Sequence, residues 1–101
     1  MTITKIQEEN KLTLKLTGWL DTTTVNALAS EVDAIESAES IVFDFNELEY
    51  ISSAGLRQVA AAAKKAKAMD ADFSITGAGK DVMAVFKLTG LDKKFHVTPK
   101  E

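Results

Sequence analysis

The chain has 101 residues, which suffices for one hydrophobic core but not for two, so we expect one domain over residues 1–101. A composition of 46% hydrophobic and 27% charged residues is ordinary for a soluble globular protein, and no apolar run is long enough to span a membrane. The net charge of −3 argues against nucleic-acid binding, and the absence of cysteine excludes disulfides and thiol chemistry. A single histidine, His96, excludes a multi-histidine metal site. No charged-then-apolar signal segment opens the chain, so the expected location is the cytoplasm.

The first part of the chain predicts a β-hairpin. Residues 2–7 alternate weakly between apolar and polar side chains, which is typical of an edge strand. Residues 11–17 alternate cleanly, with leucines on one face and threonines or lysines on the other. The segment 18–21 is expected to end this second strand. The edge strand leaves a monomer or a weak dimer as the expected states.

Between residues 21 and 51 the pattern changes from helix to strand. Residues 21–24 offer several helix caps, and an apolar stripe at helical spacing then runs from Val25 to Ile35. Residues 41–45 form an almost continuous β-branched and aromatic run, which is typical of a buried central strand. We expect a short polar turn at Asn46–Glu47 after this strand.

Two adjacent serines then precede a long alanine-rich helical pattern. A serine hydroxyl at a helix N-cap accepts a hydrogen bond from the unpaired amides of the first turn. The same amides and the helix dipole also favour a negative charge. Ser52 and Ser53 are therefore either plain caps or a place for a phosphate group.

The last third of the chain completes an alternating order of strands and helices. A strand is expected at 73–76, a third helix from Val82 to Leu88 with Gly90 as its terminating residue, and a last strand at 95–98. Alternation after the initial hairpin predicts an α/β domain with a mostly parallel sheet of about five strands and three helices. In such a sheet, function collects beyond the carboxyl ends of the strands, where the serine turn lies.

Several segments together resemble the anti-sigma factor antagonists, the small stand-alone form of the STAS domain. Residues 18–21 are similar to the family's Gly-Glu-Leu-Asp entry to the first helix. Residues 44–46 resemble its central strand, and residues 52–56 resemble its Asp-Ser-Ser/Thr-Gly-Leu turn. Residues 77–91 resemble its later Gly-containing loop and short helix ending in Gly-Leu. The resemblance covers essentially the whole chain and depends on the order and spacing of these segments together.

The resemblance implies a partner-switching mechanism in bacterial transcription regulation, without catalysis or cofactor. Family members bind an anti-sigma factor, often a serine protein kinase, until that kinase phosphorylates the hydroxyl residue after the turn's aspartate; a serine phosphatase restores binding. Laid over this chain, the phosphoacceptor position is Ser53, with Ser52 as the second candidate because it occupies the aspartate position. Trp19 stands where the family has a glutamate, so two of the usual charges are missing.

The expected partner-binding surface centres on the serine turn. Its residues are Asp21, Ser52, Ser53, Gly55 and Arg57. Two alternatives stay open: both serines only cap the helix, or the chain is a non-phosphorylated accessory subunit that docks on a transporter ATPase, which single STAS domains also resemble. Trp19 is either a core residue or an exposed aromatic anchor.

Two other motifs favour ordinary structural roles. Ser53-Ala54-Gly55 is half of a nucleophile elbow, but the first glycine is absent and only His96 could serve as the base. The segment 77–80 lacks the Ser or Thr that a phosphate-binding loop places after its lysine, and it is interpreted as a turn, with contact to a partner as a second use.

The charged residues suggest no metal site. Asp44, Glu47 and Glu49 could supply oxygens to a hard cation, but Ca²⁺ prefers six to eight of them. Asp44 is the notable acid, because it interrupts a buried run, and we expect it near the serine turn. Two lysine clusters, Lys64, Lys65 and Lys67 and then Lys93 and Lys94, are interpreted as solvated faces.

Overall fold

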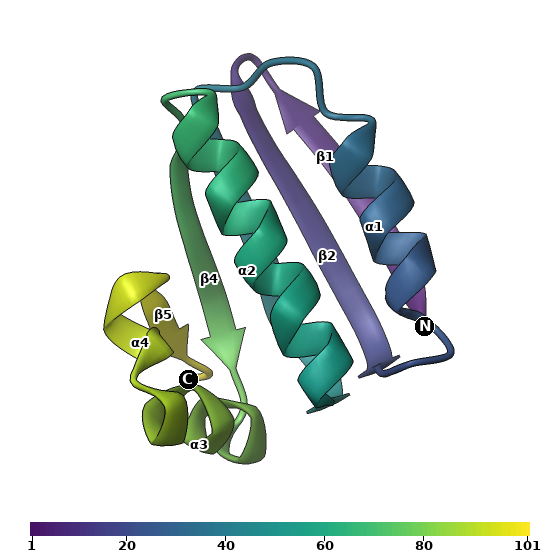
Figure 1. Ribbon diagram of the computed structural model, residues 1–101, viewed down its shortest axis with the longest axis vertical. Coiled ribbons are helices and arrows are strands. Elements are labelled where there is room, and N and C mark those ends of the chain that lie inside the picture. Colours follow the sequence, from purple (N-terminus) through teal and green to yellow (C-terminus); the bar gives the residue numbers. More distant parts are fainter.

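A computed structural model describes all residues, 1–101, and shows a five-stranded mixed sheet with four helices (Figure 1). The strand order is β1-β2-β3-β4-β5, with β1 and β2 antiparallel and the remaining neighbours parallel. The strands are β1 (Thr2–Glu8), β2 (Lys11–Leu20), β3 (Ser40–Ile51), β4 (Asp72–Ala78) and β5 (Val97–Pro99). The helices are α1 (Val25–Asp33), α2 (Ser53–Ala68), α3 (Lys80–Thr89) and α4 (Leu91–Lys94). The expected α/β class, N-terminal hairpin and mostly parallel sheet are confirmed, while the expected number of helices was one too few.

Helices α1 and α2 pack on one face of the sheet, and α3 lies beyond the ends of β4 and β5 at the bottom of Figure 1. The core lies between these helices and the strands. In Figure 1, α1 and α2 lie in front of the strands, and no helix lies behind. The alternating leucines of β2 and the two phenylalanines of β3, Phe43 and Phe45, are buried on the covered face. Phe45 of β3 contacts Phe86 of α3, which in turn packs edge-on against Phe95. Helix α3 is thus anchored to the same core.

Both central strands run further than their sequences suggest. Strand β2 continues three residues beyond Thr17 and ends at Leu20, within the segment 18–21 that was expected to end it. Strand β3 continues through Asn46 and Glu47 to Ile51, so the predicted turn at Asn46–Glu47 was wrong. The register between β2 and β3 shifts twice, between Lys15 and Thr17 and between Gly18 and Trp19. Such bulges let polar residues and a glycine with φ of 102° stay within a strand while the pairing continues.

A short fourth helix follows α3. Gly90 ends α3 in the left-handed conformation, with φ of 73°, as expected for a terminating glycine. The chain then forms α4 before β5 instead of passing directly into a strand. The spacing of residues 91–94 is too short to show helical periodicity, so the sequence carried no signal for this turn.

The carboxyl ends of β2, β3 and β4 meet at one edge of the sheet, at the bottom of Figure 1. The loops that leave these strands place residues 21–24, 52–53 and 79 at this edge. None of the helices is long and apolar enough to cross a membrane.

Candidate functional site

The two serines of the turn have different roles in the structure. Ser52 is the N-cap of α2, and its half-buried hydroxyl accepts a hydrogen bond from the Gly55 N–H at 3.2 Å. Its own N–H donates to the Leu20 carbonyl at 2.9 Å, which ties the turn to the end of β2. Ser53, the first residue of α2, is exposed, and its hydroxyl has no hydrogen-bond partner within the protein. Capping is therefore performed by Ser52, and the Ser53 hydroxyl is left free at the helix N-terminus.

Gly55 brings the start of α2 into close contact with β2. A Cβ atom at this position would lie 2.8 Å from both the Leu20 Cγ and the Leu20 carbonyl oxygen. No such distance is tolerated between a Cβ and a backbone atom, so only glycine allows this approach. Gly55 is buried, and its close approach to Leu20 fixes the position of the serine turn.

Asp21 and the threonines after it form a hydrogen-bonded turn at the same edge. The Asp21 carboxylate accepts from the Thr23 hydroxyl at 2.6 Å and from the Thr23 N–H at 2.9 Å. These bonds to Thr23, followed by those to Thr24, lower the pKa of Asp21 below its ordinary value. Asp21 is thus a half-exposed negative charge held in a defined turn. Thr24, at the N-cap of α1, donates its hydroxyl to the Trp19 carbonyl at 2.8 Å instead of accepting from the helix.

Trp19 and Tyr50 form an exposed aromatic pair beside the serine turn. The two residues are register partners on β2 and β3, and their ring centroids lie 5.0 Å apart with the planes inclined at 40°. Trp19 is 55% exposed and Tyr50 is 44% exposed. The next residues along both strands, Leu20 and Ile51, are buried, so the pair points away from the core. Trp19 is therefore not a core residue. Sequence reasoning missed Tyr50 because its pairing with Trp19 depends on the register of the two strands.

Asp44 lies away from the serine turn and has a structural role. It occupies the middle of β3, and its carboxylate accepts from the Asn46 N–H at 2.9 Å and from the Asn46 side-chain amide at 2.8 Å. Asn46 packs so closely on Gly77, which has φ of 74°, that a Cβ at Gly77 would overlap its side-chain amide. The expectation that Asp44 lies near the serines is therefore wrong, and the residue instead holds Asn46 against the end of β4.

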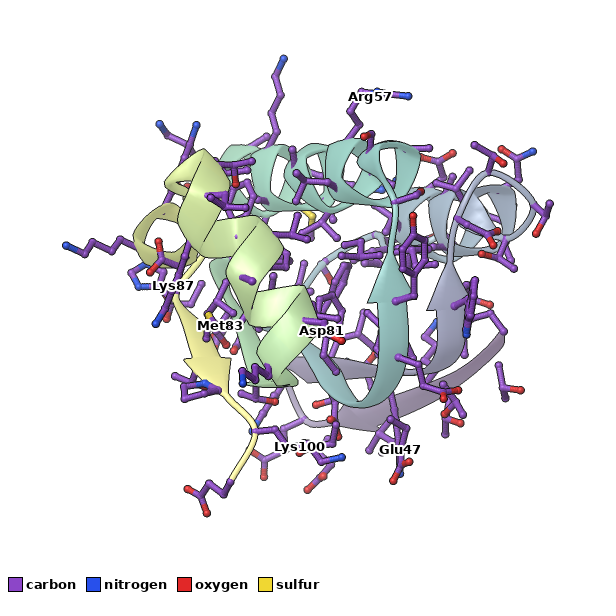
Figure 2. The ribbon with its side chains drawn as sticks, turned by 90° about the horizontal axis from the view of Figure 1, so that it is seen from below. Glu47, Arg57, Asp81, Met83, Lys87 and Lys100 are labelled. Carbon is purple, nitrogen blue, oxygen red and sulfur yellow. The ribbon has the colours of Figure 1, made fainter.

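The other candidate motifs are not assembled into sites. No group of three or more His, Asp or Glu side chains lies close enough to hold a metal ion. His96 lines a groove together with Ala60, Ala63, Lys64 and Lys67 of α2. Ser53 is the first residue of that helix, so it lies about 10 Å or more from this part of α2, measured along the helix axis. Arg57 is exposed one turn after Ser53 and projects from α2 in Figure 2. Lys65 is not simply solvated, since its ammonium group donates to the Val32 carbonyl at 2.7 Å and to the Asp33 carbonyl at 3.1 Å.

The architecture defines a small mixed-sheet α/β domain, and solved structures share it. A crystal structure of an anti-sigma factor antagonist from Mycobacterium paratuberculosis matches with a TM-score of 0.87 and 27% identity over 98% of this chain and 86% of that chain. The family model of the STAS domain matches residues 2–101, so the chain belongs to the STAS domain family.

Three structures of lower sequence identity have the same fold. The antagonist SpoIIAA in its unphosphorylated form matches with a TM-score of 0.83 and 19% identity, covering 99% of this chain and 89% of that chain. The Bacillus SpoIIAA in its phosphorylated form matches with a TM-score of 0.79 and 15% identity, covering 99% of this chain and 92% of that chain. A sulfate transporter family protein from Wolinella succinogenes matches with a TM-score of 0.81 and 11% identity, covering 95% of this chain and 82% of that chain.

Proposed function

We propose that this protein is an anti-sigma factor antagonist that binds an anti-sigma factor through the carboxyl edge of its sheet and is released by phosphorylation of Ser53. The main observation behind the proposal is that the two serines of the turn have different roles. Ser52 caps α2, which leaves Ser53 exposed with an unengaged hydroxyl at the same helix N-terminus. The 27% identity to an antagonist over nearly the whole chain supports the same function.

The proposed surface combines a free hydroxyl, charges and an aromatic anchor. Ser53 and Arg57 are exposed on the first turns of α2, and Asp21 lies in the neighbouring turn after β2. The Trp19–Tyr50 pair extends this surface, and exposed aromatic residues of this kind are enriched among the residues that dominate binding energies. The protein acts as a binding module without catalysis of its own.

A phosphate on Ser53 would change the interface without unfolding the domain. Phosphorylation adds about −1.5 to −2 charges and three acceptor oxygens at neutral pH. A helix N-terminus accommodates such a group, because its amides are unpaired and its dipole is positive. The charge therefore disrupts binding by requiring desolvation against a partner surface, rather than by disturbing α2. A phosphatase would restore binding by removing the group.

The serine at position 52 does not remove the acceptor. Where the resembling sequences have an aspartate, Ser52 still supplies the capping oxygen, since its hydroxyl accepts from the Gly55 N–H. What is lost is one negative charge beside Ser53. The proposed consequence is that recognition by a kinase relies on the shape of the turn and on the remaining neighbours, Asp21 and Arg57.

The decisive experiment is intact mass spectrometry after incubation with ATP and purified anti-sigma factor kinases, with the phosphosite then located in peptides. We expect one phosphate on wild-type protein and on Ser52→Ala, and none on Ser53→Ala. Phosphate on Ser53→Ala, or on Ser52 in the wild type, would contradict the proposed acceptor.

A binding measurement tests the second half of the proposal. Ser53→Asp should bind the anti-sigma factor at least about tenfold more weakly than wild type, a loss of about 1.4 kcal/mol, while its circular dichroism and unfolding midpoint stay unchanged. Equal affinity of the two proteins would refute the switch. Stable co-purification with a transporter ATPase, with no phosphate on Ser53, would instead indicate an accessory subunit.

A further inference from the structure

A groove lies on the domain away from the serine turn, between the second half of α2 and the segment that leads from α4 into β5. Its volume is about 630 Å³, which falls within the roughly 300–1,000 Å³ of small-molecule sites. The groove is lined by Ala60, Ala63, Lys64, Lys67, Ala71, Asp72, Phe73, Lys94, Phe95 and His96. None of these residues belongs to the proposed partner-binding surface.

The floor of the groove is apolar. Phe73 is half-buried and packs edge-on against both Phe43 and Phe95, which fixes its ring in place. The remaining apolar contacts come from Phe95, from two alanines of α2 and from Ala71, the residue before β4. Alanine is small, so an occupant could approach the helix backbone closely. Alanine also has no side-chain rotamers to lose, so binding would cost the protein little conformational entropy there.

The rim of the groove is cationic. Lys64 and Lys67 project from α2, and Lys94 approaches from the end of α4, so ammonium groups come from two separate elements. Asp72 is the single carboxylate among the lining residues, which leaves an excess of positive charge in a chain whose net charge is −3. Lysines can lay their apolar stems along an occupant and direct their charges to one end of it.

The lining side chains also restrict what the occupant is. They include no hydroxyl and no amide, and most of their polar groups are ammonium groups, which donate hydrogen bonds and accept none. An apolar body needs no hydrogen-bonding partner, while an anionic head group is complementary to the lysines. We propose that this groove binds an amphiphilic organic anion, with its apolar body over Phe73 and its carboxylate or phosphate head between Lys67 and Lys94.

This inference is independent of the proposed partner switching. The groove begins at Ala60, seven residues after Ser53, and faces the end of α4. Loss of the groove's charges should therefore leave binding at the serine turn unaltered, and the two proposals can fail separately.

The test is titration of isotope-labelled protein with four probes while the backbone amide signals are followed by NMR. Octanoate and octyl phosphate carry the proposed combination, 1-octanol has only the apolar body, and acetate has only the head group. We expect octanoate and octyl phosphate to shift the amides of Ala63, Phe73 and His96, and to bind at least about tenfold more tightly than octanol or acetate, a difference of about 1.4 kcal/mol. The stronger of the two anions identifies a carboxylate or a phosphate head.

Matched charge variants locate the head group. Lys67→Gln combined with Lys94→Gln should weaken octanoate binding about tenfold or more. Lys87→Gln combined with Lys100→Gln removes the same charge at a second groove, beside Met83 (Figure 2), and should leave binding unchanged. All four lysines are exposed, so both double variants should fold. Binding of octanol as tight as that of octanoate, equal losses in the two double variants, or no binding of either anion at millimolar concentration would each overturn the proposal.

Discussion

At the scale of single residues, adjacent side chains at the start of α2 have separable roles. Ser52 completes the backbone hydrogen bonding of the helix, Ser53 contributes nothing to it, and Gly55 lets the helix approach β2. Because the Ser53 side chain makes no hydrogen bond within the protein, it can be modified without loss of a structural contact. The turn can therefore carry a regulatory group without any rearrangement of its own hydrogen bonds.

The two serines should differ in their effect on stability. Ser52→Ala removes the side-chain acceptor for the Gly55 N–H and should lower the free energy of unfolding by about 1 kcal/mol. Ser53→Ala removes an exposed hydroxyl and should change it by less than about 0.5 kcal/mol. Urea denaturation of the two variants beside wild type measures both values. A larger loss for Ser53→Ala than for Ser52→Ala would show that the capping roles are reversed.

Gly55→Ala offers a test in which two physical effects have opposite signs. Helix propensity alone favours alanine by about 1 kcal/mol. The new methyl group, however, would lie 2.8 Å from the Leu20 carbonyl oxygen, and overpacking of this kind costs about 1–3 kcal/mol. We expect a net loss of stability, measured as a lower urea midpoint. A higher midpoint would mean that the start of α2 moves freely away from β2.

The site was predictable from sequence only where it is local. The serine turn is a contiguous pattern, so its place at a strand-to-helix junction could be predicted. The sequence alone does not show which of the two adjacent serines caps the helix. The structure distinguishes them because only Ser52 has the extended backbone of an N-cap. The Trp19–Tyr50 pair could not be predicted, since it requires the register of β2 against β3 and the bulge that shifts it.

At the scale of elements, α1 is tied to α2 through one lysine. Helix α1 has no basic residue in its own last turn, and the Lys65 ammonium group from α2 donates to the Val32 and Asp33 carbonyls near its end. A cation at a helix C-terminus is favourable both as a hydrogen-bond donor and as a partner of the helix dipole. Lys65 thus holds the two helices together across the covered face of the sheet.

Lys65→Met should loosen α1 while preserving the apolar stem of the side chain. We expect a loss of about 0.5–1.5 kcal/mol in the free energy of unfolding, because the carbonyls lose a protein donor but regain water. Amide hydrogen exchange should accelerate in the last turn of α1 more than in α2. Lys64→Met is the matched control, as Lys64 is exposed and makes no hydrogen bond to α1. Equal destabilisation by both variants would refute the link.

The elements themselves could be predicted where periodicity was long. The stripe of α1 and the alternation of β2 gave the right element types, because each extends over several repeats of its period. Asn46 and Glu47 misled the prediction because two consecutive polar residues are typical of a turn, whereas here the register against β2 shifts and the strand continues. Helix α4 is a single turn and left no periodic signal.

At the scale of the whole molecule, helices on one face leave the other face of the sheet uncovered, as Figure 1 shows. Along most of its length this face presents half-buried polar or short side chains, including Thr13, Asp44 and Thr76. Large aromatic groups appear only where β2 and β3 approach the serine turn. The exposed aromatic surface is thus concentrated at the edge that carries Ser53, so one partner could cover both features.

Trp19→Ala tests whether that concentration reflects binding. Trp19 is already 55% exposed, so its truncation should cost the fold only about 1 kcal/mol, mainly the contact with Tyr50. Affinity for the anti-sigma factor should fall by about 2 kcal/mol or more, as expected of a central aromatic anchor. Leu88→Ala is the control, because Leu88 is 88% exposed on α3 and lies eight residues, about 12 Å, beyond the start of that helix. Calorimetric titration measures the affinity of both variants for the anti-sigma factor. Equal losses of affinity would mean that exposed apolar area contributes to binding regardless of its position. An unchanged affinity for Trp19→Ala would show that the aromatic pair is not part of the interface.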